Sequence, residues 1–379
     1  MNITFISKFP DININNWSGT EYYILKSLEQ QGADLDCIAG LKDILSFPVK
    51  IKMRLFGRSK KYWVKRSPEV GKAYANQIVA QLKSPTDIIF SASTESIAYL
   101  DAGKPKAFYT DATFASMIGY YDWFDNLSQQ TYKEGMKMER QAINSSNLAF
   151  YSSDWAAQSA INDYGANPDK VKVVPFGANV NLNLSYEDVK NIVTLRNNND
   201  VCKILFLAVE WERKGGDIVV ETVKYLNEVL KQPTELHLVG IDNLPVVDEL
   251  PVYIINHGRI SKSIPEGVER IENLIQQSHF LFVPSRAEAY GVVFCESMAF
   301  GVPCISSNTG GIPTIIKDGE NGALLQVGAS IEEYAKRIYS IFSDKKRYED
   351  MSLYAFNDYK TRLNWDVAGQ TIMKYLKEL

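Results

Sequence analysis

Residues 283–315, VPSRAEAYGVVFCESMAFGVPCISSNTGGIPTI, decide the fold of this chain. An apolar strand, a polar loop, a helix, a second strand and a glycine turn are expected in that order. The helix, VVFCESMAF, carries one ionisable side chain, that of Glu296, and a helix of this composition belongs in a protein interior. Burial of this carboxylate is costly unless hydrogen-bond donors surround it.

A second carboxylate, Glu288, lies eight positions before Glu296, on the other side of Gly291. The ribose hydroxyls of a nucleotide would supply the donors that a buried Glu296 needs. The segment alone leaves two alternatives open. Either Glu296 pairs with an arginine from elsewhere in the chain, or both acids only favour the positive end of a helix.

Length, charge and hydropathy limit the classes of protein to which this chain can belong. A chain of 379 residues is too long for one ordinary core, so two domains are expected. Its net charge of -4 argues against nucleic acid as the main partner. The N-terminus, MNITFISKF, shows no signal peptide, and no apolar run approaches the roughly 20 residues that span a bilayer. The sequence therefore predicts a cytoplasmic protein whose four scattered cysteines are reduced thiols.

Strand-like runs alternate with helical patterns along the whole chain, which is typical of stacked β-α units and parallel sheets. The expected strands are 3–7, 34–39, 87–92, 106–110, 148–153 and 172–176 in the first half, and 202–208, 235–240, 252–256, 280–284 and 303–307 in the second. A polar linker between the two series predicts two doubly wound domains, at 1–180 and 181–355. The last helix, about 360–379, has one apolar face and is expected to pack back on the first domain. Ligands of such sheets bind at the carboxyl ends of the strands.

WERKGGD (211–217) directly follows one expected strand and precedes a helix. Arg213 and Lys214 are thus placed at a strand-to-helix turn, where two cations would neutralise a pyrophosphate without a metal. Gly215 and Gly216 let the backbone come close to a ligand, and the helix start offers free N–H groups to an anion. An ordinary solvated turn remains the alternative.

Two further turns offer anion-binding amides after two later strands. One is at the head of the buried helix and comprises Tyr290, Gly291, Val292 and Val293. The other comprises Thr309, Gly310 and Gly311. Three such turns and two acids predict an anion-receptive site more strongly than any one of them does.

EAYGVVFCE (288–296), followed by SMAFGVPCISSNTGGIPTII, resembles the E-x7-E signature of the retaining group 1 glycosyltransferases of glycosyltransferase family 4, and WERKGG is similar to their donor-phosphate turn. WSGTEYYILKSLEQQG and YTDATFASMIGYY match one bacterial branch of the same family, so the resemblance spans nearly the whole chain. It implies the α/β GT-B fold, in which two Rossmann-like domains with doubly wound parallel sheets face each other across an interdomain cleft. The first domain would bind the acceptor and the second the nucleotide sugar.

The resemblance also implies a retaining, metal-independent hexosyltransferase. The donor would be a UDP-, GDP- or ADP-linked sugar, the acceptor a hydroxyl of a saccharide, lipid or small molecule, and no further cofactor would be needed. Glu288 would accept hydrogen bonds from the donor sugar, and Glu296 from the ribose. Arg213 and Lys214 would stabilise the departing pyrophosphate, assisted by the amides of residues 290–293.

Further roles implied by the resemblance rest on single residues. Gly258 and Arg259 fall where such enzymes contact the base. Gly19 belongs to a glycine loop that faces the donor phosphates, although a serine or threonine helix cap would explain the same turn. Asp111 would orient a sugar hydroxyl, or it would only cap the next turn.

The chain departs from the family's pattern at two positions. Many relatives carry a histidine near the donor sugar, whereas His237, His257 and His279 all lie in or beside apolar strands of the second domain. No histidine is therefore expected in the catalytic set. Ala208 stands where relatives often have an arginine, whose charge Arg213 would take over.

Residues 50–72 contain nine lysines or arginines and one acid, interleaved with aromatic residues. Such a stretch predicts peripheral contact with an anionic surface at the inner membrane face, or else a solvated, mobile acceptor loop. Asp34 and Asp36 form a DxD pattern, but this pattern begins a strand and is common by chance, so no metal site is predicted.

Other classes of function remain open. Sugar-nucleotide epimerases and phosphorylases share the architecture, but epimerases place other acids and histidines in the site, and a vitamin-B6 phosphorylase needs a cofactor lysine that cannot be placed here. A catalytically silent nucleotide-sugar binding protein is expected to lack Glu288, Glu296 or the Arg213–Lys214 pair, and all four residues are present.

Overall fold

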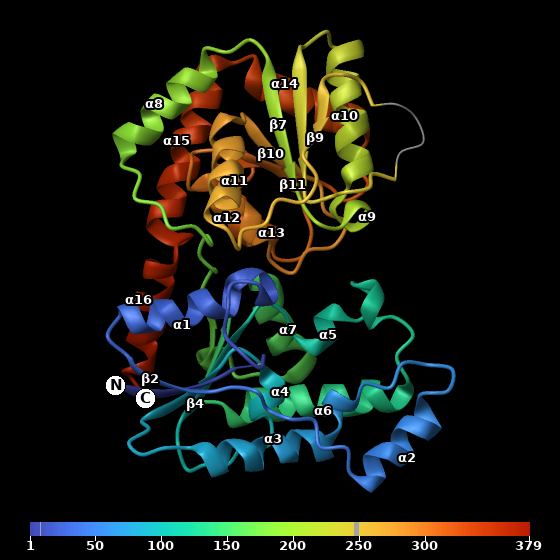
Figure 1. Cartoon of the computed structure of the whole chain (residues 1–379), viewed down its shortest axis with the longest axis vertical. Coiled ribbons are helices and arrows are strands. Elements are labelled where there is room, and N and C mark those ends of the chain that lie inside the picture. The colour runs from blue at the N-terminus through green and yellow to red at the C-terminus, as the bar shows by residue number, and fades with distance from the viewer. Residues whose placement is uncertain (8, 246–249) are drawn as a thin grey trace. The chain divides into compact units, whose positions relative to one another are not determined.

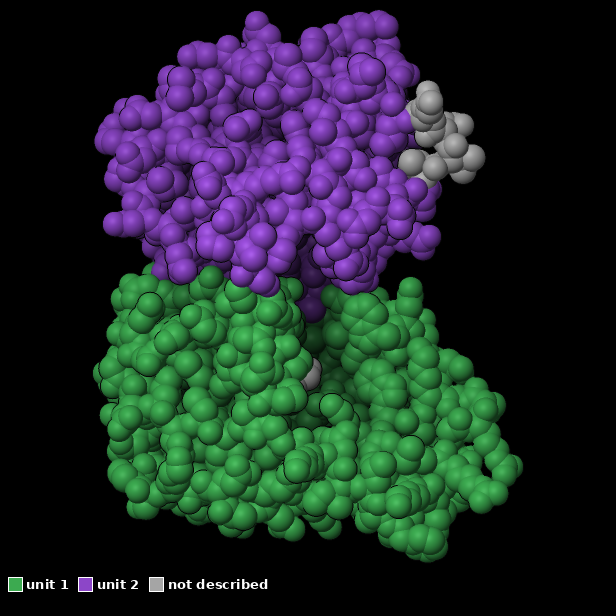
Figure 2. Space-filling view, viewed as in Figure 1, with its two compact units in different colours: residues 1–176, 365–379 green, residues 177–364 purple. Residues whose placement is uncertain are grey.

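The computed structural model describes residues 1–7, 9–245 and 250–379, and the chain divides into two compact units (Figure 2). Unit 1 comprises Met1–Phe176 and Trp365–Leu379, and unit 2 comprises Gly177–Asn364. Each unit is built on one six-stranded parallel sheet, with helices on both of its faces (Figure 1).

The sheet of unit 1 has the strand order β2-β1-β3-β4-β5-β6. Its strands are β1 (Asn2–Ile6), β2 (Asp34–Ile38), β3 (Ile88–Ser91), β4 (Lys106–Thr110), β5 (Leu148–Tyr151) and β6 (Val171–Val173). Its helices are α1 (Thr20–Gln30), α2 (Phe47–Phe56), α3 (Pro68–Gln81), α4 (Thr94–Ile97), α5 (Phe114–Met117), α6 (Gln129–Ser145), α7 (Asp154–Tyr164) and α16 (Trp365–Leu376). Short 3-10 turns cover Asn16–Gly19, Val64–Arg66, Asp122–Phe124 and Pro168–Lys170.

The sheet of unit 2 has the strand order β12-β11-β10-β7-β8-β9. Its strands are β7 (Cys202–Leu207), β8 (Thr234–Val239), β9 (Ile254–Asn256), β10 (Phe280–Val283), β11 (Cys304–Ser307) and β12 (Gly322–Leu325). Its helices are α8 (Tyr186–Asn197), α9 (Trp211–Lys214), α10 (Gly216–Glu228), α11 (Pro265–Gln277), α12 (Val292–Met298), α13 (Ile312–Ile315), α14 (Ile331–Phe342) and α15 (Lys345–Arg362).

The predicted doubly wound fold is confirmed. Strands β3, β5 and β10 are buried at every residue, as expected for central strands that helices cover on both faces. In unit 1, Phe90 lies between Phe5 and Phe150, with ring centroids 6.0 and 6.3 Å away. All eleven predicted strands are present, whereas β12 was missed. Its sequence, GALL, is short, begins with two weak strand formers and is only half buried.

The boundaries of the units differ from the predicted 180 and 355. Unit 2 extends to Asn364, because α15 runs unbroken to Arg362 and packs on α8 and α12. Helix α16 belongs to unit 1 and packs on α1, so closely that a Cβ on Gly369 would lie 2.7 Å from the carbonyl oxygen of Ser27. Across the described part of the chain, every helix is too short or too polar to cross a bilayer.

The strand order fixes where each sheet can hold a ligand. In unit 2 the order reverses between β7 and β10, which are paired neighbours. The loops that follow these two strands run in opposite directions over the sheet and leave room at its carboxyl edge. The two segments with the strongest sequence signals, 211–217 and 288–296, follow these two strands.

Candidate functional site

The loop after β7 holds the two predicted pyrophosphate cations in a tight turn. Helix α9 ends at Lys214, and Gly215 follows with φ +75°, a left-handed conformation that favours glycine. A Cβ atom on Gly215 would lie 2.5 Å from the carbonyl oxygen of Pro284, and one on Gly216 would lie 2.4 Å from the indole ring of Trp211. Gly215 therefore lets the loop after β7 pack against the loop after β10, and Gly216 lets the same loop fold tightly over Trp211.

Three of the four predicted catalytic side chains meet at this contact. The Lys214 ammonium forms an ion pair and a hydrogen bond with the Glu288 carboxylate. The Arg213 guanidinium lies 3.6 Å from the same carboxylate oxygen. These side chains keep only 10–18% of their accessible surface, so water screens their charges weakly.

Arg213 is oriented by contacts that sequence analysis missed. Its Nε and Nη2 donate to the two carboxylate oxygens of Glu210 at 2.8 and 2.7 Å, and its Nη1 donates to the Ala287 carbonyl at 2.8 Å. The bond from Arg213 holds the pKa of the Glu210 carboxyl below its ordinary value. The spacing of three residues between Glu210 and Arg213 is the sequence signal that would have revealed this pair.

The other two predicted turns adjoin the same cluster. Gly291, before α12, has φ +96°, and a Cβ there would lie 2.6 Å from the Phe294 ring and 3.3 Å from Cγ of Glu288. The N–H of Gly311, before α13, donates to the carbonyl oxygen of Glu288 at 3.1 Å. The turns after β7, β10 and β11 therefore meet around one residue, Glu288.

At the start of α12, one side chain belongs to the hydrophobic core, whereas the neighbouring backbone amides adjoin the candidate site. Tyr290 is buried, and its hydroxyl lies 3.6 Å from the Cys295 sulfur, so its side chain belongs to the core. Val292 and Val293 form the first turn of α12 and are half-buried. Their backbone amides, together with that of Gly291, remain the predicted anion donors.

Glu296 lies in α12, and its side chain is only 5% exposed, which confirms the predicted burial of this carboxylate. Both of its oxygens accept hydrogen bonds from the Lys262 ammonium at 2.7 Å. The alternative that Glu296 pairs with an arginine is therefore wrong, because its partner is a lysine. Lys262 comes from the loop before α11, where no motif marks it and 34 positions separate it from its partner.

We expect the change Lys262→Met to destabilise the ligand-free protein, because it leaves Glu296 buried without a counter-charge. The free energy of unfolding should fall by about 2 kcal/mol, less than for a fully buried pair because the Lys262 side chain is 43% exposed. Urea unfolding measures this loss. Adding Glu296→Gln to the same protein should recover most of it, and equal losses in the single and double variants would argue against the pair.

Gly258 and Arg259, the predicted base contacts, lie just after β9. Gly258 has φ +64°, and its carbonyl accepts the N–H of Gly240 from the loop after β8 at 2.9 Å. Asp242 in that loop accepts the Arg259 N–H at 2.8 Å and lies 3.4 Å from Arg259 Nε. The Arg259 side chain is exposed, and its loop continues to Lys262. The structure thus places both residues at the carboxyl edge of the unit 2 sheet.

Gly19 and Asp111 belong to unit 1, where they follow β1 and β4. Gly19 is itself the N-cap of α1, with φ +84°, so the serine or threonine cap considered above is wrong. Trp17 and Ser18 also have positive φ values, 47° and 54°, which are costly for residues with side chains and cluster at functional turns. The cap of α5 is Thr113, so Asp111 does not cap that helix.

The three histidines lie in or beside strands of unit 2, as predicted. Burial lowers the pKa of His279 to about 3, and His237 Nδ1 lies 3.0 Å from His257 Nε2. Asp36, of the DxD pattern, forms an ion pair with Lys83 at 2.8 Å. Within residues 1–7, 9–245 and 250–379, no three or more His, Cys, Asp or Glu side chains are grouped so as to hold a metal ion.

Comparison with known sequences assigns the second half of the chain. Residues 190–358 match the family described as glycosyl transferases group 1. A D-inositol 3-phosphate glycosyltransferase of Acidothermus cellulolyticus is 26% identical over 202 residues, which cover 51% of this chain and 45% of the relative. A protein of the same name from Xylanimonas cellulosilytica is 26% identical over 250 residues, which cover 62% of this chain and 58% of the relative. The chain spans about half the length of the curated relatives it matches.

Solved structures resemble the whole chain. Sucrose-phosphate synthase from Thermosynechococcus elongatus has a TM-score of 0.70 at 14% identity and covers 100% of this chain and 98% of its own. Anabaena HepE in complex with UDP and glucose has a TM-score of 0.63 at 17% identity and covers 100% of this chain and 99% of its own. At identities this low, the similarity supports only a shared fold. That fold agrees with the two parallel sheets of this chain. This chain therefore has the GT-B fold, and its residues 190–358 match the group 1 glycosyltransferase family.

Proposed function

We propose that this protein is a retaining glycosyltransferase that moves a hexosyl group from a nucleotide-diphosphate sugar to an acceptor hydroxyl without a metal ion. The observation that carries the proposal is the meeting of Arg213, Lys214 and Glu288 at the switch point of the unit 2 sheet. Open α/β sheets bind their ligands at this kind of position. The UDP and glucose in the similar Anabaena structure make a UDP-linked hexose the first donor to test.

The side chains of the site supply three interactions in this reaction. Lys214 and Arg213 stabilise the charge that grows on the diphosphate as the glycosidic bond breaks, and their poorly hydrated surroundings strengthen this effect. Glu288 accepts hydrogen bonds from hydroxyls of the donor sugar. Glu296 accepts them from the ribose, while Lys262 holds its carboxylate in place. The departing phosphate oxygen takes the acceptor proton on the same face of the sugar, so the anomeric configuration is retained.

Nucleotide binding and turnover test the proposal together. A nucleoside diphosphate at a hundredfold excess over its dissociation constant should stabilise the protein by about 2.7 kcal/mol in a thermal-shift screen of UDP, GDP and ADP. The matching sugar nucleotide should then be consumed only with an acceptor, and product analysis should show a retained anomer. No shift with any of the three nucleotides would count against the proposal. An epimerised donor without transfer would assign the epimerase reaction instead.

We further propose that helix α2 of unit 1 contacts an anionic lipid surface. Residues 50–56, the first part of the basic stretch, lie in helix α2 (Phe47–Phe56), so this part is not a loop. Phe47, Ile51 and Leu55 recur every fourth residue and therefore share one face, yet they are 77%, 42% and 61% exposed. Lys50 and Arg54 adjoin this face. An exposed apolar stripe flanked by cations suits the interface of an anionic membrane.

We expect the double change Lys50→Glu and Arg54→Glu to weaken vesicle binding. Each basic residue near an anionic surface contributes about 1 kcal/mol, so loss of both should lower the affinity for phosphatidylglycerol-rich vesicles roughly thirtyfold. Co-sedimentation measures this, and high salt should mimic the effect. Lys224→Glu and Lys346→Glu, on the surface of unit 2, serve as the matched control. Equal binding by the wild type and the α2 variant would remove the lipid surface from the account.

A further inference from the structure

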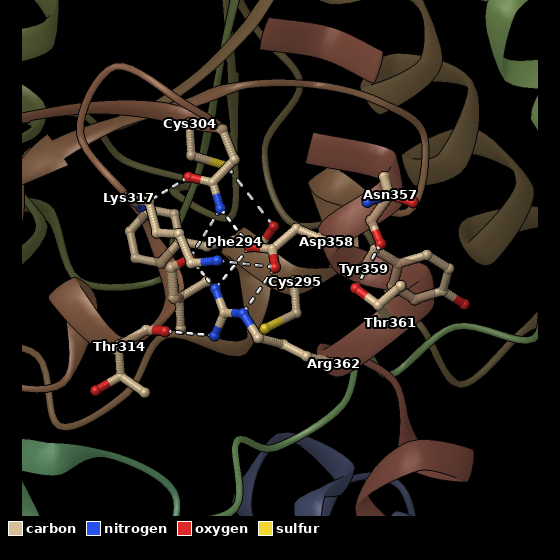
Figure 3. Close-up of polar contacts among 12 residues, drawn as sticks. Phe294, Cys295, Cys304, Thr314, Lys317, Asn357, Asp358, Tyr359, Thr361 and Arg362 are labelled. Carbon is tan, nitrogen blue, oxygen red and sulfur yellow. Dashed lines mark hydrogen bonds and ion pairs between the residues drawn. The ribbon is translucent and has the colours of Figure 1, made fainter. Parts of the chain in front are cut away.

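A partly buried polar network lies where α15 ends, around the guanidinium of Arg362 (Figure 3). Arg362 Nη1 donates to the Thr314 carbonyl at 2.5 Å, and Nη2 donates to the Ile315 carbonyl at 2.8 Å. These are the last two residues of α13. The last carbonyls of any helix lack an intrahelical partner, so a cation that donates to them is well placed.

The same guanidinium also forms an ion pair with Asp358, which lies one turn earlier in α15. Arg362 Nε and Nη2 donate to the two Asp358 oxygens at 2.7 and 2.6 Å. Asn321 donates to Asp358 at 2.7 Å. The Lys317 ammonium lies 3.5 Å from the Asp358 carboxylate (Figure 3). Because Asp358 and Asn321 are buried, the network fixes Arg362 with little freedom.

Helix α13 connects this network to the donor cluster. It spans only four residues, Ile312–Ile315, and is preceded by the Gly311 N–H that donates to the Glu288 carbonyl at 3.1 Å. A helix this short has too few internal hydrogen bonds to keep its place alone. Its position therefore depends on the burial of Ile312 and Ile315 and on what holds its two ends. The Glu288 carbonyl holds the start, whereas Arg362 holds the end together with Asn321, which donates to the Ile315 carbonyl at 3.0 Å.

We propose that Arg362 is a positioning residue for Glu288, acting through α13 and the Gly311 hydrogen bond. An arginine suits this role because its planar fork reaches two carbonyls and a carboxylate at once, which a lysine ammonium cannot do. A displacement of about 1 Å at a reacting group can lower turnover by about a hundredfold. The effect on turnover rests on the function proposed above, whereas the effect on the position of α13 does not.

Two variants of Arg362 test this role. In Arg362→Met with Asp358→Asn both opposite charges are removed, so no unpaired charge is left buried beside α13. Arg362→Lys keeps the charge but loses the fork. For each, kcat per nucleotide-binding site should fall at least tenfold, while KM for the donor stays within threefold because Lys214 and Glu296 are unchanged. A merely structural role would lower thermal stability and leave kcat per binding site as in the wild type, which would overturn the proposal.

Hydrogen exchange gives a second readout that needs no activity. The amides of residues 309–312 and 314–316 should exchange at least tenfold faster in both variants, and unchanged exchange would overturn the positioning role. If the wild type proves to bind no nucleotide sugar, the proposed function fails while this readout still decides the role of Arg362. Arg337→Met is the matched control, since Arg337 pairs with Asp318 at 3.2 Å in the same unit. It should change neither kcat nor the exchange of residues 309–312 and 314–316.

Discussion

Replacing Lys214 by alanine should lower turnover by a factor of roughly 10² to 10³ while the protein stays folded. The Lys214 side chain is 12% exposed and is paired with Glu288, so its charge is poorly screened by water. Arg213 alone cannot make up for the loss, because Glu210 already pairs with its charge and all three of its guanidinium nitrogens donate to Glu210 or to the Ala287 carbonyl. Steady-state kinetics with the donor identified by thermal shift measures the loss.

The control for this change is Lys224→Ala. Lys224 lies in α10 of the same unit and pairs with Glu221 at the surface at 2.8 Å, so its loss should leave turnover within twofold of the wild type. Circular dichroism and thermal unfolding establish that both variants are folded. A Lys214→Ala protein with turnover within threefold of the wild type would remove the leaving-group role from Lys214.

Replacing Glu288 by glutamine should separate turnover from nucleotide binding. Without a ligand, Glu288 neutralises Lys214 and contributes to neutralising Arg213. A diphosphate must therefore compete with Glu288 for these cations, and glutamine removes the competing charge. We expect nucleoside diphosphate to bind Glu288→Gln as tightly as the wild type or more tightly, while turnover falls by about 10² to 10³ because the donor sugar loses its acceptor of hydrogen bonds.

Isothermal titration calorimetry and steady-state kinetics on one preparation decide this prediction. Glu221→Gln, an exposed acid of the same unit, is the control and should change neither quantity. Weaker nucleotide binding with normal turnover in Glu288→Gln would invert the expected pattern. In that event Glu288 would be a binding group for the nucleotide and not a group that acts on the donor sugar.

The fold could be predicted largely because parallel strands leave a strong signal. Strands such as β10, FLFV, are apolar at every position, since helices cover both faces of the sheet. The strand β12 gave no such signal, because it is an edge strand of four residues, two of them weak strand formers and the two leucines only half-buried, and it needs its neighbour β11 to form. The boundary at Asn364 was missed for a similar reason, as the packing of α15 on distant helices decides where the unit ends.

Sequence analysis identified the part of the site that lies in local motifs. Glycines with forced backbone conformations, at 215 and 291, mark turns that can be located from the sequence. Partners from distant loops left no such mark. Lys262 is 34 positions from Glu296, and Arg362 is 48 positions from Thr314. These contacts depend on the folded arrangement of strands and loops, which no local pattern encodes.

The proposed donor site is tested by a crystal structure with the nucleoside diphosphate that gives the largest thermal shift. We expect diphosphate oxygens within hydrogen-bonding reach of the Lys214 ammonium, and ribose hydroxyls donating to the Glu296 carboxylate, both at the carboxyl edge of the unit 2 sheet. A nucleotide bound elsewhere, with Lys214 and Glu296 still engaged only by Glu288 and Lys262, would contradict this site.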